Sequence, residues 1–134
     1  MASTVELRVA IYNNEGGVYK HWGLFIDGPT AEQKIDLQVE GSTNRFRFDR
    51  KLENALTTDG IVGLIPLCEV PLSSIGAIDQ AAAEAPIHNP YTGYNCQDYV
   101  VDLLDSLEEM ELTNGKDAKC QASKSLVLSK QEGR

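Results

Sequence analysis

The sequence predicts an α+β domain in which an antiparallel β-meander packs against a helix that carries a cysteine. Two patterns support this prediction. Segments 4–13, 18–27, 34–40 and 45–49 alternate apolar and polar side chains, as strands with one buried face do. The segment from Cys96 onward instead repeats its apolar side chains at helical spacing. Because the strands follow one another through short connections, we expect antiparallel neighbours.

The second and third expected strands are joined by a turn centred near Pro29. Antiparallel pairing about this centre places His21 opposite Gln38, with Asp36 as the next polar residue on the same face. His21 shares that face with Gly23, because side chains alternate along a strand. We therefore expect open space in front of the imidazole and a polar partner within its reach.

A fifth apolar segment covers residues 61–70 and contains Pro66. Proline has no backbone N–H, so we expect an edge strand or a bulge at this position. After this segment, Ser73 or Ser74 is expected to cap a helix that runs to Ala85.

The most regular helical pattern begins at Cys96 and is expected to stop at residues 114–115. Its apolar face, which we expect to be buried, consists of Cys96, Val100, Leu103, Leu104, Leu107 and Met110. Its polar face consists of Gln97, Asp98, Asp102, Asp105, Glu108 and Glu109. We divide the chain into a domain of residues 1–115 and a C-terminal extension of residues 116–134, which forms a short strand, a helix or a loose tail.

The composition is that of an acidic, single-domain protein. The chain has 134 residues, a net charge of −8 and 42% hydrophobic residues, which suffices for one domain with its own core. An acidic surface repels phosphate backbones, so we expect no nucleic-acid partner. The charge is uneven, with +3 on residues 116–134 and −11 on residues 1–115. Because the sequence shows neither a long apolar run nor a signal-peptide pattern, we expect no membrane span and a cytoplasmic location.

The chain contains three cysteines, Cys68, Cys96 and Cys120, and two histidines, His21 and His88. An odd number of cysteines without CxxC spacing argues against a disulfide framework and a zinc site. The histidines also lack metal-site spacing, so we expect no metal and no cofactor. Cys68 lies in an apolar strand and is expected to pack in the core, whereas no role is expected for Cys120.

Cys96 is the candidate nucleophile. Backbone N–H groups and the helix dipole favour a thiolate in the first turn of a helix, and a thiolate is the nucleophile of cysteine hydrolases and transferases. The alternative is a small buried side chain without a chemical role. His21 is the candidate base, and His88, in a proline-flanked loop, is its rival.

A catalytic imidazole needs a partner that fixes its tautomer, and Gln38 or Asp36 on the next strand is suitable. Acyl transfer also needs hydrogen-bond donors for an oxyanion, and the backbone N–H of Cys96 is the first candidate. The weaker candidates for oxyanion or substrate contact are Tyr12, Asn95, Tyr94 and Asp36.

Two motifs, HWGLFI at 21–26 and NCQDYV at 95–100, resemble the paired motifs of the permuted papain-like (NlpC-type) thiol superfamily. In its lecithin:retinol acyltransferase-like branch, a strand begins with His-Trp and a later helix begins with Asn-Cys. The segment YTGYNC at 91–96 is similar to the approach to the cysteine in the PPPDE branch, which includes deubiquitinating isopeptidases. Small fungal proteins with a late Cys-Gln helix look similar as well.

The resemblance covers roughly residues 5–112, and the order His before Cys marks the circularly permuted form. It implies a meander that carries His21 and Gln38 and packs against the helix that presents Cys96. By the same resemblance, Cys96 is the nucleophile, His21 the general base and Gln38 the orienting residue. Many acyltransferase-like members have a second histidine at the position of Gln38.

The residues and the resemblance together predict a cysteine-dependent hydrolase or acyltransferase. Its substrate would be a small-molecule or peptide-like compound with an amide, ester or thioester carbonyl. Three alternatives stay open: an inactive binding module on the same fold, a lyase or cyclase that uses Cys96 and His21 as acid and base, and a PPPDE-like isopeptidase. The sequence gives no indication of the oligomeric state.

Overall fold

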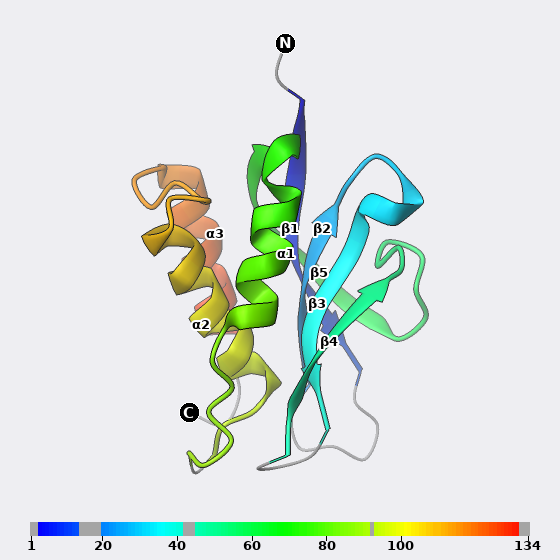
Figure 1. The fold of residues 1–134 in the computed structure, drawn as a ribbon, viewed down its shortest axis with the longest axis vertical. Coiled ribbons are helices and arrows are strands. Elements are labelled where there is room, and N and C mark those ends of the chain that lie inside the picture. Colours follow the sequence, from blue (N-terminus) through cyan, green and yellow to red (C-terminus); the bar gives the residue numbers. More distant parts are fainter. Residues whose placement is uncertain (1–2, 14–19, 42–44, 92, 132–134) are drawn as a thin grey trace.

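The fold is α+β, with a five-stranded antiparallel sheet and helices on one of its faces (Figure 1). A computed structural model describes residues 3–13, 20–41, 45–91 and 93–131. Its strands are β1 (Thr4–Tyr12), β2 (His21–Asp27), β3 (Lys34–Glu40), β4 (Arg47–Leu52) and β5 (Ile61–Pro71). Its helices are α1 (Ile75–Glu84), α2 (Cys96–Glu109) and α3 (Ala118–Ser129), and short 3-10 turns cover Ala31–Gln33 and Leu72–Ser74.

Strands β1 to β4 form the predicted meander, and β5 returns to pair with β1. The strand order is β4-β3-β2-β1-β5, which makes β5 an edge strand. The pairing of β5 shifts beside Pro66, because Leu7 lies opposite Cys68 whereas Arg8 lies opposite Pro66. Leu67 is therefore the additional residue of a bulge. Both expectations drawn from the proline, an edge strand and a bulge, are confirmed.

Two strands differ in extent from the sequence prediction. The prediction starts the second strand at residue 18, whereas β2 starts at His21, and residues 14–19 lie outside the described residues. The prediction limits the fourth strand to 45–49, whereas β4 continues to Leu52, opposite Ile35 of β3. The polar composition of β4 conceals this pairing, because an exposed edge strand needs few apolar side chains.

The register between β2 and β3 differs from the prediction by two residues. The prediction pairs His21 with Gln38, whereas the structure pairs Leu24 with Leu37. The connection is not a simple turn, because the 3-10 turn Ala31–Gln33 is part of it. A shift by two residues leaves every side chain on its predicted face. His21 and Gln38 therefore still share a face.

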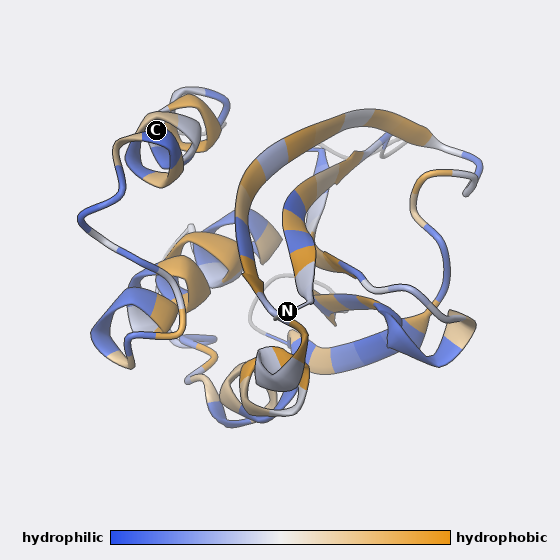
Figure 2. Ribbon diagram, turned by 90° about the horizontal axis from the view of Figure 1, so that it is seen from above, coloured by the Kyte–Doolittle hydropathy of each residue, from blue (hydrophilic) through white to orange (hydrophobic). Residues whose placement is uncertain are grey.

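The sheet is buried on both faces. The face toward the helices carries the main core, and in Figure 2 the sheet curves with the helices on its outer side. The other face carries a smaller apolar cluster of Ala10, Phe25 and Ala55. Ala55 lies between β4 and β5, so this connection covers the second face. His21 and Gln38 lie on this second face, where Gln38 is buried and His21 is partly buried.

Helix α2 starts at the predicted residue but differs from the predicted pattern near both ends. Gln97 and Asp98 are expected on the exposed face, yet their exposed fractions are 0% and 5%. Met110 is expected in the core, yet it is exposed, because α2 ends at Glu109 rather than at residues 114–115. The rest of the apolar face is buried as predicted, namely Cys96, Val100, Leu103, Leu104 and Leu107.

The C-terminal extension forms helix α3, one of the forms the sequence left open, and α3 contacts α2 through polar side chains. Lys124 Nζ lies 2.5 Å from Asp105 Oδ1 and 3.0 Å from Glu108 Oε1. Beyond the helix end, Gln131 Nε2 donates to Asp98 Oδ1 at 2.9 Å. The positively charged extension thus lies on the acidic face of α2. Opposite charges of the extension and of residues 1–115 favour this contact.

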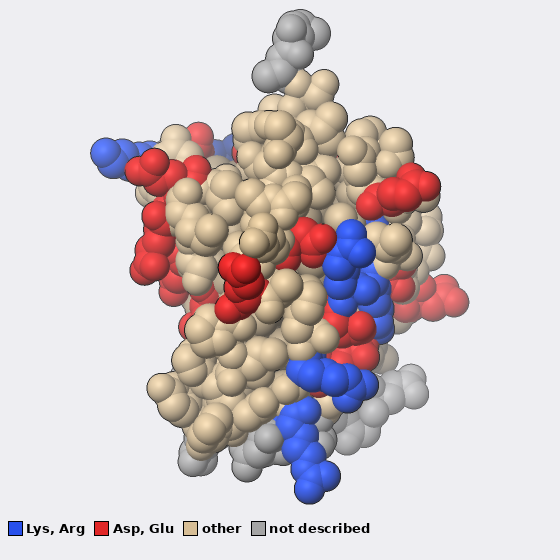
Figure 3. Space-filling model, in the orientation of Figure 1, with Lys and Arg blue, Asp and Glu red and all other residues tan. Residues whose placement is uncertain are grey.

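Charge is also uneven on the face of the molecule drawn in Figure 3. Acidic side chains follow the edge where α2 lies, and basic side chains lie over β4. Two of the basic residues form ion pairs, Arg50 with Asp79 at 2.8 Å and Lys51 with Glu40 at 2.5 Å. Among the helices within the described ranges, none has the length and apolar character to cross a membrane.

Candidate functional site

The start of α2 fixes the backbone around Cys96. The Asn95 side chain accepts hydrogen bonds from the backbone N–H groups of Gln97 at 2.9 Å and Asp98 at 3.4 Å. The Asp98 carboxylate in turn accepts one from the Asn95 N–H at 2.9 Å. This capping box places Cys96 at the positive end of the helix dipole. The Asn95 side chain, predicted as a substrate contact, is engaged in the cap.

The Cys96 sulfur lies at the start of β2. Its Sγ atom is 3.8 Å from the backbone carbonyl oxygen of Lys20, the residue that precedes His21. Gln97 Nε2 donates to the same oxygen at 2.9 Å. Cys96 is 8% exposed. The helix that carries the cysteine is therefore fixed to the strand end that carries the histidine. Cys96 packs in the core on the helix side, whereas the His21 side chain lies on the other face of the sheet.

His21 and Gln38 are joined by a side-chain hydrogen bond between the imidazole Nε2 and the amide Oε1. An amide oxygen only accepts hydrogen bonds, so Nε2 carries the proton and Nδ1 is the unprotonated nitrogen of the neutral ring. Gln38 is 1% exposed. Of the two predicted partners of the imidazole, Gln38 is thus the one bonded to it, and the bond selects one tautomer.

Tyr12 and Asp36 form a second hydrogen-bonded pair beside the imidazole. The Tyr12 hydroxyl donates to Asp36 Oδ2 and lies 3.2 Å from Glu53 Oε1. The Tyr12 ring faces His21 across the strand pair, with 5.5 Å between ring centroids. Because two carboxylates engage its hydroxyl, Tyr12 supports the imidazole rather than acting as the predicted oxyanion donor.

The space over Gly23 is filled, contrary to the prediction of open space in front of His21. A Cβ atom added at Gly23 would overlap Asp36 Oδ1. The Asp36 carboxyl thus covers the glycine and is itself completely buried. Gly23 is required for the close approach of a buried carboxyl group, not for access of a substrate.

The charge of this buried pair depends on pH. Burial raises the pKa of Asp36 to about 7, and the hydrogen bond from Tyr12 opposes this rise. Burial and the nearby Asp36 charge raise the pKa of Tyr12 as well, so its phenol stays protonated at neutral pH. Asp36 is therefore the group of this pair that changes charge near neutral pH.

Tyr94 and His88 belong to an aromatic cluster beside α2. Their ring centroids are 5.8 Å apart, and His88 stacks on Tyr91 with centroids 4.7 Å apart. His88 Nε2 is 4.0 Å from the carboxylate of Asp102, which lies more than one turn beyond Cys96. Burial raises the pKa of Tyr94 to about 12. The contacts of His88, the rival base, thus go to aromatic rings and to Asp102.

A protein-family model matches residues 7–114, which is most of the chain. The chain belongs to the family of unknown function DUF6540. The matched residues include all the candidate site residues, whereas α3 lies beyond them. No curated protein and no solved structure matches the chain.

Three residues contribute to the site of this DUF6540 domain without having been predicted. Lys20 acts through its backbone carbonyl, which no side-chain pattern can indicate. Gln97 occupies a position that helical periodicity assigns to the exposed face, and Glu53 lies in a polar connection without periodicity. In the described parts of the chain, no group of three or more His, Cys, Asp or Glu side chains is gathered as a metal ion requires.

Proposed function

We propose that this chain is a cysteine-dependent hydrolase or acyltransferase in which Cys96 is the nucleophile and His21 the general base. The supporting observation is the hydrogen bond from His21 Nε2 to Gln38 Oε1, beside the contact of Cys96 Sγ with the Lys20 carbonyl. The bond leaves Nδ1 as the basic nitrogen, and the contact brings the sulfur to the residue before the histidine. We further propose that the domain has a permuted papain-like (NlpC-type) fold, because that fold would combine a histidine strand with a helix that begins at a cysteine.

In the proposed reaction, the imidazole of His21, the first residue of β2, turns past the strand end toward the helix side, and its Nδ1 takes the proton from the Cys96 thiol. The thiolate attacks a substrate carbonyl carbon, and the carbonyl oxygen becomes an oxyanion near the N-terminus of α2, where the helix dipole favours negative charge. The tetrahedral intermediate collapses, His21 returns the proton to the leaving group, and a thioacyl group remains on Cys96. Water or an amine then attacks the thioester and regenerates the thiol.

A hollow lined by Lys20, though not by Cys96 or His21, is our candidate for the acyl part of such a substrate. Its volume is about 630 Å³, and its walls come from β1, β2, β5 and the end of α3. Most of its lining side chains are apolar, among them Trp22, Val62 and Leu64. We therefore propose a small-molecule or peptide-like substrate whose acyl group is apolar.

A second candidate function is a binding module without catalysis. The burial of Cys96 and the proximity of its sulfur to the Lys20 carbonyl favour it, because a thiol that donates to a carbonyl keeps its proton. Gln38 also favours it, since a neutral amide stabilises an imidazolium less than a carboxylate does. The two candidates differ in whether an acyl group is ever bound to Cys96.

Trapping the acyl group tests the proposal. We would incubate the reduced chain with p-nitrophenyl acetate, stop the reaction with acid and locate the acetyl group by peptide mass spectrometry. Cleavage after Glu69 and Glu84 by a Glu-specific protease puts Cys68 and Cys96 on separate peptides, whereas a tryptic peptide would hold both. We expect acetylation of Cys96 in the wild type and in Cys120→Ser, and much slower acetylation in His21→Ala. Labelling of Cys120 at the same rate as Cys96 would favour the binding module.

A further inference from the structure

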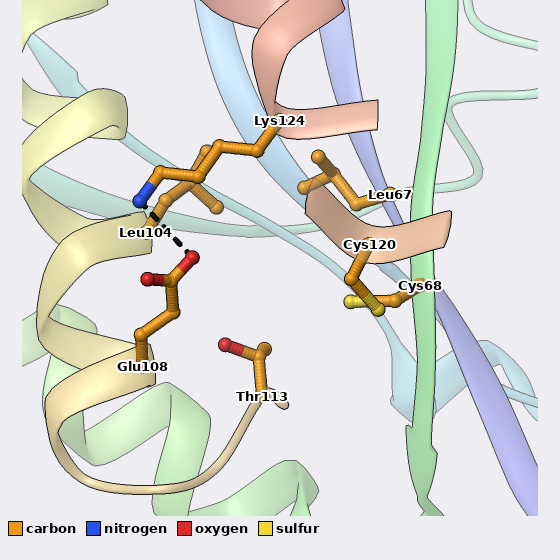
Figure 4. Close-up of a pocket in the computed structure, with 7 residues that line it drawn as sticks. All are labelled: Leu67, Cys68, Leu104, Glu108, Thr113, Cys120 and Lys124. Atoms are coloured by element: carbon orange, nitrogen blue, oxygen red, sulfur yellow. Dashed lines mark hydrogen bonds and ion pairs between the residues drawn. The ribbon is translucent and has the colours of Figure 1, made fainter. Parts of the chain in front are cut away.

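Cys68 and Cys120, which lie 52 positions apart in the sequence, meet between β5 and α3. Figure 4 shows the two side chains pointing toward each other, one from the edge strand and one from the first turn of α3. The two cysteines line the same small cavity. Cys68 is buried and Cys120 is partly exposed. The expectation that Cys120 has no role and Cys68 merely packs in the core overlooks this contact, because the fold of residues 116–134 was not predictable.

A small cavity lies beside the two thiols. Its volume is about 20 Å³, which is enough for about one water molecule. It is lined by Leu67, Leu104, Thr113 and the ion pair of Glu108 with Lys124, as well as by both cysteines. The thiols are thus in contact with each other and next to a space that a molecule of the size of water can enter.

Few residues of helix α3 are buried. Of its twelve residues, Val127 alone is buried. It packs along β5, and its polar contacts with α2 come from Lys124 and Gln121, surface contacts that contribute little to stability. A covalent bond between α3 and β5 would therefore change how firmly this helix is held.

We propose that Cys68 and Cys120 form a reversible disulfide that fastens α3 to the edge of the sheet, with a peroxide as the oxidant. The partly exposed Cys120 sulfur attacks a peroxide oxygen of hydrogen peroxide, the O–O bond breaks, and a sulfenic acid and one water molecule form. The Cys68 sulfur then attacks the Cys120 sulfur and loses its proton, and the S–O bond breaks to release a second water molecule. The two thiols are oxidised by two electrons in total, and the peroxide is reduced to two water molecules.

The surroundings of Cys68 explain why it is not the sulfur that peroxide oxidises but the one that attacks the oxidised Cys120 sulfur. Burial and the Cys120 side chain raise the pKa of Cys68 to about 12, and the charges of Asp117 and Glu108 act in the same direction. Cys68 therefore stays protonated and reacts slowly with reagents in solution. It reacts readily only with a sulfur already held against it, because proximity replaces a bimolecular encounter.

The disulfide would also hold the end of α3 near the start of α2. Gln131, just beyond α3, donates to Asp98, whose other carboxylate oxygen accepts the hydrogen bond from Asn95 in the capping box. Because Cys120 lies in the first turn of α3 and Gln131 beyond its last, the disulfide acts on this contact only through the helix between them. The proposal depends on the position of α3 and not on any reaction at Cys96.

The test uses the full chain, first reduced and then treated with hydrogen peroxide at the same molar concentration as the protein. After alkylation of the remaining thiols and digestion with a Glu-specific protease without reductant, we expect one cross-linked pair of peptides containing Cys68 and Cys120. Cys96→Ser should form the same cross-link, and Cys120→Ser should not. Dithiothreitol should reverse it. A cross-link that includes Cys96, a cross-link between chains, or three separate oxidised cysteines would overturn the proposal.

Thermal unfolding tests the fastening of α3 separately. Closing a loop of this length by a disulfide is expected to raise the unfolding midpoint by roughly 5–10 °C relative to the reduced chain. Amide hydrogen exchange in α3 should slow at the same time. Because Cys120 is partly exposed, Cys120→Ser should fold normally. Its unfolding midpoint and its hydrogen exchange in α3 should be the same after peroxide treatment as after reduction. A disulfide that forms but leaves both the midpoint and the exchange in α3 unchanged would refute the fastening.

Discussion

The amide oxygen of Gln38 on β3 accepts a hydrogen bond from Nε2 of His21 on β2. This bond, partly buried on the face of the sheet away from the helices, determines which imidazole nitrogen is basic. It also links the two strands near the point where Cys96 approaches Lys20. The chemical competence that we propose for Cys96 depends on this arrangement.

Replacement of Gln38 should therefore reduce the reactivity of Cys96. In Gln38→Ala the imidazole loses its hydrogen-bond partner, and we expect alkylation of Cys96 at neutral pH to slow about tenfold. Removal of a residue that orients a histidine in a metal site has an effect of similar size. In Gln38→Glu the carboxylate stabilises the imidazolium, and the rate should equal or exceed that of the wild type. Alkylation rates by peptide mass spectrometry check both variants. Equal rates in Gln38→Ala and the wild type would mean that the bond has no influence on the cysteine.

Substitution of Gly23 should destabilise the fold. The methyl group of Gly23→Ala would overlap the buried Asp36 carboxyl, so we expect a loss of about 1–3 kcal/mol in the free energy of unfolding. Gly76→Ala is the matched control, because its new methyl group meets no atom within 4 Å and lies in a helix. This control should be neutral or more stable by up to about 1 kcal/mol. Urea unfolding measures both, and an unchanged Gly23→Ala would contradict the close packing of Asp36.

The buried Asp36 should make stability depend on pH. Its pKa is about 7 in the folded chain and about 4 when unfolded, so the folded state holds the proton more tightly between these values. The wild type should therefore lose stability as the pH rises from about 4 to 7, by an amount on the order of 4 kcal/mol, and lose no more from this group above pH 7. In Asp36→Asn this loss should be absent.

Urea unfolding of both proteins at several pH values checks this dependence. Asp59→Asn serves as the control, because Asp59 is exposed and should leave the pH profile of the wild type unchanged. Parallel profiles for Asp36→Asn and the wild type would contradict the assignment of the titrating group to Asp36.

The Asn95 side chain, which caps α2, should contribute to stability, whereas Ser74, which precedes α1, should not. Asn95→Ala removes the acceptor for two backbone N–H groups of α2, which should cost about 1–2 kcal/mol in the free energy of unfolding. Ser74 precedes α1 but makes no side-chain capping bond, so Ser74→Ala should change stability by less than about 0.5 kcal/mol. Equal effects of the two substitutions in urea unfolding would argue against the capping box.

The sequence predicts much of the fold because the main core is made by one apolar face of each element. The alternation in β1 and β3 and the helical spacing from Cys96 reflect that apolar face, although the polar face of β3 is buried as well. Pro66 indicates the edge and the bulge because its missing N–H restricts where it can lie. The boundary of β4 was not predictable, because a polar edge strand carries no such pattern.

The site was predictable to the extent that side chains, rather than backbone atoms, define it. The shared face of His21 and Gln38 follows from strand periodicity and survives an error of two residues in the register. The burial of Gln97 could not be predicted from the sequence pattern, because its hydrogen-bond partner is the backbone carbonyl of Lys20. The contact of Cys68 with Cys120 did not follow either, because it depends on where α3 packs.

The measurement that tests the central claim most directly is the rate of alkylation of Cys96 by iodoacetamide against pH, in the wild type and in His21→Ala. Peptides from a Glu-specific protease report each cysteine separately. We predict that Cys96 reacts at neutral pH at least about tenfold faster than free cysteine and Cys120, and that His21→Ala removes this advantage. A Cys96 that reacts no faster than free cysteine, or equally fast without His21, would contradict the proposed pair and favour a binding module.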